Sequence, residues 1–279
     1  MIVSAHWICG WYDSWMEVLY GLHPVEEALR AGGRRLEYVL ISRERSVKLE
    51  HLAELCRVTG VRCSMSGKDE LTKIAKTDAH QGVVGAVRER QFLTIEDLLR
   101  AKGRFERKFF LALDGVEDPH NLGALLRSAD GAGVDGVVLP ERRSAPITGV
   151  VAKTSAGASE HVAIARVTNV TRALEQMKKA NIWVIGLDER GSMNYTDFDW
   201  NTDCCLVLGA EGAGLHDAVK KTCDHLLRIP MIGSVSSLNV SVAGAVVMYE
   251  ALRQKLGLAA GTAQPPAAKA VKPRKGLGS

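Results

Sequence analysis

The sequence predicts an α/β protein in two parts, a small α/β domain followed by a larger domain on a buried parallel sheet. A chain of 279 residues with 46% apolar composition has room for one large core or two modest ones. Near-continuous apolar segments alternate with helical patterns, which is typical of a parallel sheet with helices on both faces. A charged stretch at residues 91–107 separates two such series of segments. We therefore place a linker there.

The first domain is expected over residues 16–90. Ser46 precedes one apolar helical pattern and Gly60 follows it, as N-cap and C-cap residues do. Strands are predicted where short apolar segments lie between turn residues. The expected helices are 23–33 and 46–60, and the expected strands are 36–42, 61–67 and 82–89. In the linker, Thr94 and Asp97 have the spacing of a capping pair, which predicts a short helix.

The second domain is expected over residues 108–257. Its predicted strands are 108–115, 134–140, 161–167, 181–189, 203–210 and 225–231, and its clearest helices are 171–180 and 215–223. Because polypeptide chains rarely knot, the pattern by itself predicts an ordinary open sheet.

Both ends of the chain differ from the body. Residues 1–15 carry Trp7, Trp11 and Trp15 at helical spacing, which would suit docking on a partner, but we expect this extension to lie outside the folded body. Residues 258–279 are rich in alanine, proline, glycine and lysine and are expected to be a disordered basic tail.

Charge sets a limit on the kind of partner. The net charge is +4, and the tail alone contributes four basic residues and no acid, so the body is close to neutral. A strongly basic nucleic-acid-binding domain is therefore excluded, and any such contact must come from local clusters. The candidate clusters are Arg30, Arg34 and Arg35, and Arg142 and Arg143.

The six cysteines show no CxxC spacing, and Cys204 and Cys205 lie in an apolar strand pattern. They are expected to be reduced core residues of a cytoplasmic protein. No segment approaches the roughly 18 apolar residues of a membrane span, and no secretory signal is evident. No His or Cys spacing suits a metal site, so neither a membrane nor a metal is expected.

Three segments carry the chemical signal: 117–133, 206–214 and 229–245. In the first, Asn121 and Arg127 lie about two helical turns apart behind an apolar strand, so both can reach one anionic ligand. The second is a glycine-rich loop after a strand, and its Glu211 argues against a bound phosphate because the two charges would repel. The third leads into the last helix, which Ser236, Ser237 or Asn239 could cap.

These segments, in this order and spacing, resemble the three motifs of the SpoU family of RNA ribose 2′-O-methyltransferases. The likeness extends from about Leu19 to Gly257. It implies a SPOUT trefoil knot in the C-terminal domain and a small preceding domain, similar to ribosomal protein L30e, that grips RNA. It further implies transfer of a methyl group from S-adenosylmethionine to a guanosine ribose 2′-hydroxyl in the P-site loop of 23S rRNA, by a homodimer.

The resemblance also implies roles for individual residues. Gly209, Ile229 and Leu238 match the positions that contact the cofactor, largely through backbone groups. The implied catalytic set is Asn121, Arg127, Glu211, Ser237 and Asn239. Glu211 is expected to anchor Arg127 or neighbouring loop amides.

Arg127 lies among small apolar residues, where an arginine usually has a carboxylate or phosphate partner. Because a guanidinium rarely gives up its proton, we expect Arg127 to hold the adjoining phosphate and stabilise the developing alkoxide. His120 is an alternative general base. Asn121 could also be merely the N-cap of its helix.

Gly131, Gly133 and Gly136 form a GxGxxG pattern, which could indicate a dinucleotide site. That fingerprint requires a strand before the glycines and a helix after them, whereas this sequence predicts the reverse order. Two other functions stay open, namely ribose methylation of tRNA and noncatalytic RNA binding. A binding protein has no need for all five catalytic-type residues.

Overall fold

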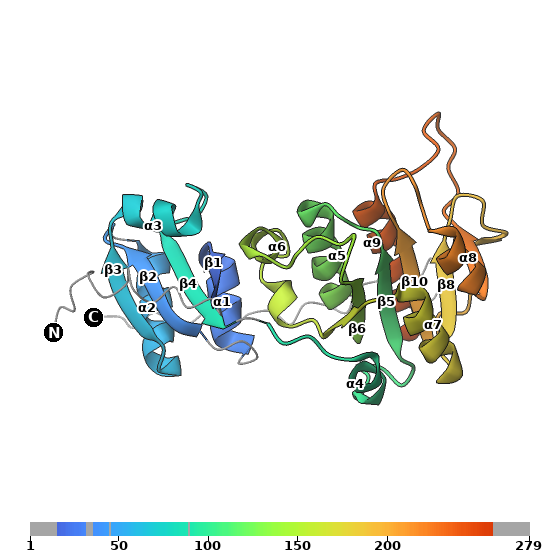
Figure 1. Ribbon diagram of the computed structural model, residues 1–279, viewed down its shortest axis with the longest axis horizontal. Coiled ribbons are helices and arrows are strands. Elements are labelled where there is room, and N and C mark those ends of the chain that lie inside the picture. Colours follow the sequence, from blue (N-terminus) through green and yellow to red (C-terminus); the bar gives the residue numbers. More distant parts are fainter. Residues whose placement is uncertain (1–15, 32–35, 45, 89, 259–279) are drawn as a thin grey trace, which may run out of the picture.

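The computed structural model describes residues 16–31, 36–44, 46–88 and 90–258, which form two sheets with flanking helices (Figure 1). The strands of the first sheet are β1 (Met16–Tyr20), β2 (Leu36–Ser42), β3 (Arg62–Ser66) and β4 (Val83–Arg88). Those of the second are β5 (Phe109–Asp114), β6 (Gly136–Pro140), β7 (Ile164–Val167), β8 (Trp183–Leu187), β9 (Met193–Asn194), β10 (Cys204–Gly209) and β11 (His225–Arg228).

The first sheet has the order β1-β4-β2-β3, with β4 antiparallel to both neighbours and β3 parallel to β2. It packs with α1 (Leu22–Ala31), α2 (Val47–Thr59) and α3 (Lys68–Ala75). The predicted elements of this part are confirmed, while β1 and α3 were not predicted. Gly60 ends α2 with φ +73°, as expected, whereas Ser46 caps its start without a side-chain hydrogen bond.

The second sheet has the order β7-β6-β5-β10-β8-β11-β9, and every pairing in it is parallel. The late strand β10 lies between β5 and β8, so strands distant in the sequence meet at the centre. Since all seven strands run the same way, their carboxyl ends share one edge of the sheet. The loops that leave β5, β10 and β11 therefore lie on the same side of the domain.

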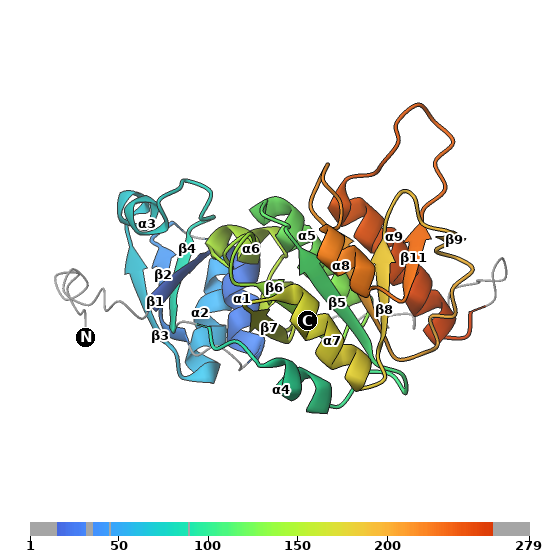
Figure 2. The same ribbon diagram turned by 45° about the vertical axis from the view of Figure 1, so that its right-hand side comes forward.

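Alternate side chains of the central strand β5 pack into two separate hydrophobic cores, one on each face of the sheet. Phe109, Leu111 and Leu113 face α5 (Pro119–Gly131) and α9 (Val240–Lys255). Phe110 and Ala112 face α4 (Ile95–Arg100), α7 (Val170–Lys179) and α8 (Asp217–Thr222). All five side chains are fully buried. The sheet therefore has a helical layer on each face, as the near-continuous apolar strand patterns predict (Figure 2).

A short helical segment joins the two parts of the molecule. It comprises α6 (Gly149–Thr154) and the 3-10 turn Ala158–Glu160, neither of which was predicted. A Cβ on Gly149 would lie 2.7 Å from the Tyr20 ring and 2.8 Å from the Val18 carbonyl, so β1 and α6 approach too closely for any side chain. On its other side, α6 packs on α5, where a Cβ on Gly123 would lie 2.6 Å from Thr154. Through α6, the first sheet is therefore packed next to α5, the helix that carries Asn121.

Several local predictions can be judged directly. Thr94 and Asp97 form a reciprocal capping box at the start of α4. In the GxGxxG segment, α5 ends at Gly131 and is followed by β6, so the helix does come first. The tryptophans of residues 1–15, Arg34, Arg35 and the basic tail lie outside the described residues. Within the described part, no helix is long and apolar enough to cross a membrane.

Candidate functional site

Three chain segments converge at the carboxyl edge of the second sheet: the turn from β5 into α5, the loop after β10, and the segment from β11 to α9. They are the three segments that the sequence singled out. Figures 1 and 2 show the last of them rising beyond the sheet edge between β11 and α9.

A network of three side chains ties these segments together. Asn121 donates from Nδ2 to Glu211 Oε2 at 3.0 Å, and Asn239 donates from Nδ2 to Glu211 Oε1 at 3.2 Å. The same Asn239 Nδ2 also donates to Asn121 Oδ1 at 3.0 Å. A carboxylate only accepts hydrogen bonds, so Glu211 fixes the orientation of both amides. Both expected partners of Glu211, Arg127 and the neighbouring loop amides, differ from the partners that the structure shows, which are the side-chain amides of Asn121 and Asn239.

Helix caps place two of these residues. Asp118 caps α5 by accepting from the His120 amide at 3.0 Å, so the alternative that Asn121 is the N-cap is wrong. Asn121 instead sits inside the first turn, where it is buried. Asn239 is the N-cap of α9, because its Oδ1 accepts from the Ser241 amide at 2.9 Å. The side-chain oxygen of Asn239 therefore caps the helix, while its Nδ2 donates to Asn121 and Glu211 in the network.

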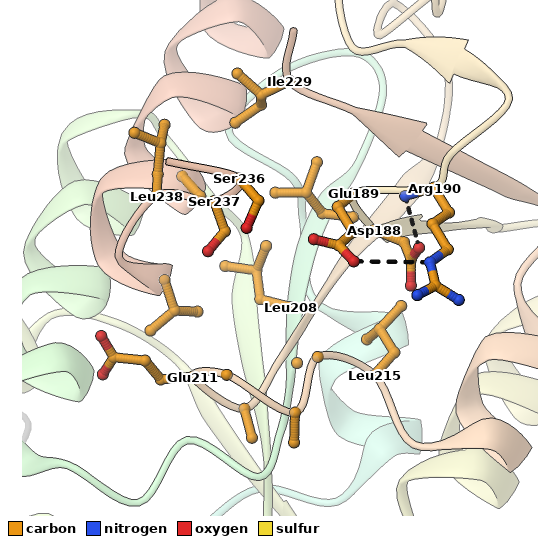
Figure 3. Close-up of a pocket in the computed structure, with 18 of the residues that line it drawn as sticks. Asp188, Glu189, Arg190, Leu208, Glu211, Leu215, Ile229, Ser236, Ser237 and Leu238 are labelled. Atoms are coloured by element: carbon orange, nitrogen blue, oxygen red, sulfur yellow. Dashed lines mark hydrogen bonds and ion pairs between the residues drawn. The ribbon is translucent and has the colours of Figure 1, made fainter. Parts of the chain in front are cut away.

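Beside the network lies a cavity of about 430 Å³ bounded by the loops after β8, β10 and β11. Gly209, Ile229 and Leu238, the three predicted cofactor contacts, all line it, as do Ser237 and Glu211. In Figure 3, Ser237 and Leu238 face the loop after β8 across the cavity. Gly209 has no room for a side chain, since a Cβ there would lie 2.1 Å from the Gly214 backbone, so the loop folds directly onto its strand.

The cavity is richer in carboxylates than in cations. Its charged lining residues are Asp188, Glu189, Arg190, Glu211, Asp217 and Lys220. Asp188 pairs with Lys220 at 2.7 Å and accepts from the Arg190 amide at 2.9 Å. Burial acts to raise the pKa of Asp188, but these two hydrogen bonds hold the pKa below its ordinary value. The sequence analysis did not predict Asp188, Glu189 and Arg190 as site residues. The only signal for them in the sequence is their position at the end of an apolar strand pattern.

Arg127 lies on the exposed side of α5. The expectation that it is tucked among small apolar residues is wrong, and in the described part of the chain it has neither a hydrogen bond nor an ion pair. Of the two expected partners, the carboxylate is therefore absent among these residues, and the RNA phosphate stays a prediction. Helical geometry explains the difference, because Leu125, Leu126 and Ala129 turn to the core while Arg127 turns away. His120 is also exposed. Both side chains can therefore be reached from solvent.

Cys204 and Cys223 do not line this cavity. Burial raises the pKa of the Cys204 thiol to about 12, and that of Cys223 to about 12. Such thiols remain protonated and inert at neutral pH. No group of three or more His, Cys, Asp or Glu side chains is placed to hold a metal ion among the residues that the structure describes.

Comparison with protein families gives two matches that together span most of the chain. Residues 108–249 match the SpoU rRNA Methylase family, and residues 18–93 match the family described as RNA 2′-O ribose methyltransferase substrate binding. The chain belongs to the SpoU methylase family. It is a methyltransferase of this family, and the resemblance drawn from the three segments is confirmed.

The alignments with individual relatives span nearly the whole length of those relatives. The 23S rRNA (guanosine-2′-O-)-methyltransferase RlmB of Vibrio cholerae is 39% identical over 242 residues, which is 86% of this chain and 98% of the relative. RlmB of Escherichia coli is 38% identical over 240 residues, 86% of this chain and 99% of the relative. YacO of Bacillus subtilis, whose name places it in the TrmH family of tRNA/rRNA methyltransferases, is 40% identical over 242 residues, 86% of this chain and 96% of the relative.

Solved structures confirm the fold class. The SpoU methyltransferase AviRb from Streptomyces viridochromogenes, in complex with its cofactor AdoMet, matches with a TM-score of 0.74 and 26% identity, covering 88% of this chain and 92% of AviRb. The AdoMet-bound rRNA methyltransferase from Sinorhizobium meliloti matches with a TM-score of 0.72 and 26% identity, covering 86% and 88%. The fold is therefore a SPOUT α/β domain preceded by a substrate-binding domain.

Proposed function

We propose that this protein transfers a methyl group from S-adenosylmethionine to the ribose 2′-hydroxyl of a guanosine in the P-site loop of 23S rRNA. The observation that carries the proposal is the Asn121–Glu211–Asn239 network, which joins the three motif segments at the edge of a carboxylate-rich cavity. The names of the RlmB relatives supply the substrate class and the modified atom. The P-site loop follows from the sequence resemblance.

The cavity suits S-adenosylmethionine better than a phosphate-bearing cofactor. Its lining holds four carboxylates, Asp188, Glu189, Glu211 and Asp217, against two cations, Arg190 and Lys220. A pyrophosphate would be repelled there, whereas a sulfonium and an ammonium group would be attracted. Bound in this cavity, S-adenosylmethionine would supply an electrophilic methyl group. Gly209, Ile229 and Leu238 would contact it mainly through backbone groups.

The residues around the cavity can be given roles. A ribose hydroxyl is a poor nucleophile, so its proton must be removed or polarised as the methyl group is transferred. Arg127 would hold the adjoining phosphate and stabilise charge on the ribose oxygen, because a guanidinium donates hydrogen bonds but stays protonated at neutral pH and so cannot take up the ribose proton. Asn121, Ser237 and Asn239 would position the ribose and cofactor, and Glu211 would keep both amides in place.

The substrate-binding domain would choose the RNA. It spans residues 16–90 in our assignment, with a linker at 91–107 and the catalytic domain at 108–257. Recognition of folded RNA rests mostly on shape and backbone contacts. Because α6 packs against both β1 and α5, RNA held by the first domain would sit in a fixed relation to Asn121. The names of the RlmB relatives favour rRNA over tRNA as that substrate.

We also expect a homodimer in the cytoplasm. The last helix and its C-cap residue carry exposed apolar side chains at seven-residue spacing: Val242 is 49%, Tyr249 51% and Leu256 54% exposed. Large apolar side chains aligned in this way favour a protein contact. Multi-angle light scattering should therefore give twice the chain mass, and Tyr249→Glu should shift the protein toward monomer.

Two measurements test the function itself. Calorimetry in the presence of a chelator should show binding of S-adenosylmethionine, and binding of NAD instead would overturn the cofactor assignment. Incubation with labelled S-adenosylmethionine and protein-free 23S rRNA should then transfer label to the RNA. RNA binding without any transfer would favour the noncatalytic alternative.

A further inference from the structure

A second polar cluster lies beside the three motif segments and is not part of the network described above. Asp114 ends β5, His216 precedes α8, and Arg143 lies in the loop after β6. His216 Nδ1 is 3.0 Å from Asp114 Oδ1, and the His216 backbone amide donates to Asp114 Oδ2 at 2.8 Å. On the other side of the ring, Nε2 lies 3.2 Å from Arg143 Nη1. The three side chains are therefore linked in series, from the buried Asp114 through His216 to Arg143 at the surface.

The chemistry of the partners fixes the state of the histidine. A guanidinium has donors only, so His216 Nε2 must accept from Arg143. The ring proton therefore sits on Nδ1 and is donated to Asp114, which is 94% buried. Asp114 thus sets the tautomer, and the tautomer holds Arg143 at a defined place on the surface.

Arg143 has two unusual properties. Its backbone φ is +58°, a left-handed conformation that costs free energy in a residue other than glycine. It is exposed, and no carboxylate lies within ion-pair distance of it in the described part of the chain. Among the described residues, its side-chain partner is the His216 imidazole, which accepts through Nε2 and is a weaker acceptor for a guanidinium than an anion is. Such an arginine is available for an anionic ligand.

The cluster adjoins the proposed reaction centre. A Cβ on Gly115 would lie 3.3 Å from Ala210 and 3.4 Å from His216 Cε1, so only the Gly115 backbone separates His216 from the residue before Glu211. The loop that carries Arg143 is tied to the same turn, because the Ala145 amide donates to the Val116 carbonyl at 3.0 Å. That turn leads directly into α5 and Asn121.

From this geometry we infer that Asp114, His216 and Arg143 form a binding site for an RNA phosphodiester next to the target nucleotide. Arg143 makes the charge-assisted contact to a nonbridging phosphate oxygen, and His216, oriented by Asp114, is the positioning residue that keeps Arg143 in place before RNA arrives. The inference rests on the proposed function, since it takes the ligand to be the RNA substrate. It adds a contact outside the five motif residues.

Salt dependence of RNA binding tests the role of Arg143. The probe is a fluorescent P-site-loop transcript carrying 2′-deoxyguanosine at the target, so that binding is measured without turnover. Arg143→Ala should weaken binding about tenfold and reduce the slope of log affinity against log salt by about 0.7 to 0.9. With unmodified RNA it should raise KM more than it lowers kcat. Binding and salt slope equal to the wild type would overturn the inference.

A double-mutant cycle tests the role of His216. His216→Phe keeps a ring but removes the acceptor, so it should weaken RNA binding several-fold in the wild-type background and have no further effect in Arg143→Ala. The adjacent exposed Arg142→Ala is the matched control, and its effect should add to that of His216→Phe. Additive effects of His216→Phe and Arg143→Ala would show that the histidine does not act through Arg143.

Asp114→Asn gives a third, isosteric test. The His216 backbone amide needs an acceptor, so the asparagine oxygen must occupy the Oδ2 position and its NH₂ group must face Nδ1. The ring proton then moves to Nε2, which points at Arg143 and displaces it. The variant should match His216→Phe in RNA binding and keep wild-type affinity for S-adenosylmethionine; wild-type RNA binding would contradict the tautomer argument. A wild-type protein that neither binds nor methylates the RNA would instead refute the proposed function.

Discussion

The two sides of the Asn121–Glu211–Asn239 network differ in charge and in how their charged groups are partnered. On the cavity side, carboxylates predominate and Asp188 is already paired with Lys220. On the other side, the exposed Arg127, Arg142 and Arg143 have no carboxylate within ion-pair distance among the described residues. A cationic cofactor and an anionic RNA require these opposite surfaces. The comparison shows how a nearly neutral protein can bind RNA without a strongly basic domain.

The largest effect is expected from Arg127→Ala. If Arg127 serves the RNA side alone, the variant should lose methyl transfer by about a thousandfold while its affinity for S-adenosylmethionine changes little. Single-turnover rates and calorimetry measure the two quantities. His120→Ala is the control and should retain substantial activity. The opposite ranking would assign the general base to His120.

Glu211→Gln should lower the rate of methyl transfer by a smaller factor, because it changes only the network between the two sides. A glutamine has one oxygen where Glu211 has two acceptors, so one of the two asparagine amides would face an NH₂ group. Turning Asn121 over would only move the mismatch to Asn239, whose oxygen caps α9. We expect a rate about 10- to 100-fold lower, from a loss of about 1–3 kcal/mol at a partly buried network. Activity within twofold of the wild type would show that amide orientation is unimportant.

On the cavity side, Asp188→Asn should show a pH-dependent loss of stability. Because the pKa of Asp188 is lowered in the folded protein, its ionised form stabilises the fold above the unfolded pKa of about 3.9. That stabilisation is lost as pH falls through the lower folded value. The melting temperature of the variant should therefore lie below that of the wild type at pH 7, and the difference should shrink toward pH 3. A difference that does not vary with pH would contradict the account.

Removal of the chain ends should matter least. A protein lacking residues 1–15 should keep its melting temperature and activity, and loss of folding would show that the tryptophan-rich segment packs on the body. A protein lacking residues 258–279 should bind RNA slightly more weakly, with a smaller salt dependence, because four basic residues are removed. Unchanged salt dependence would show that the tail does not contact RNA.

Much of the fold follows from the sequence because long apolar patterns record burial on one or both faces. Six of the seven strands of the second sheet follow from such patterns, and so do α2 and α7. The short elements β1, α3, α6 and β9 do not, since two to eight residues hold too little periodicity. The position of β10 between β5 and β8 could not be predicted either, because strand order depends on contacts between distant segments.

The site shows a similar division. The motif residues were found in the sequence, but the hydrogen bonds among Asn121, Glu211 and Asn239 were not. Asn121 has the sequence context of a helix cap, but Asp118 fills that position, and Arg127 is exposed because its place on α5 points away from the core. His216 gave no sequence signal, since its neighbours Asp114 and Arg143 are 102 and 73 residues away.

The most direct test of the account is nuclease digestion and mass spectrometry of protein-free 23S rRNA and bulk tRNA after incubation with the enzyme and labelled S-adenosylmethionine. The account predicts one labelled guanosine in the P-site loop, with the methyl group on the ribose 2′-oxygen, and little label in tRNA. Label confined to tRNA, or attached to a base, would contradict the substrate assignment.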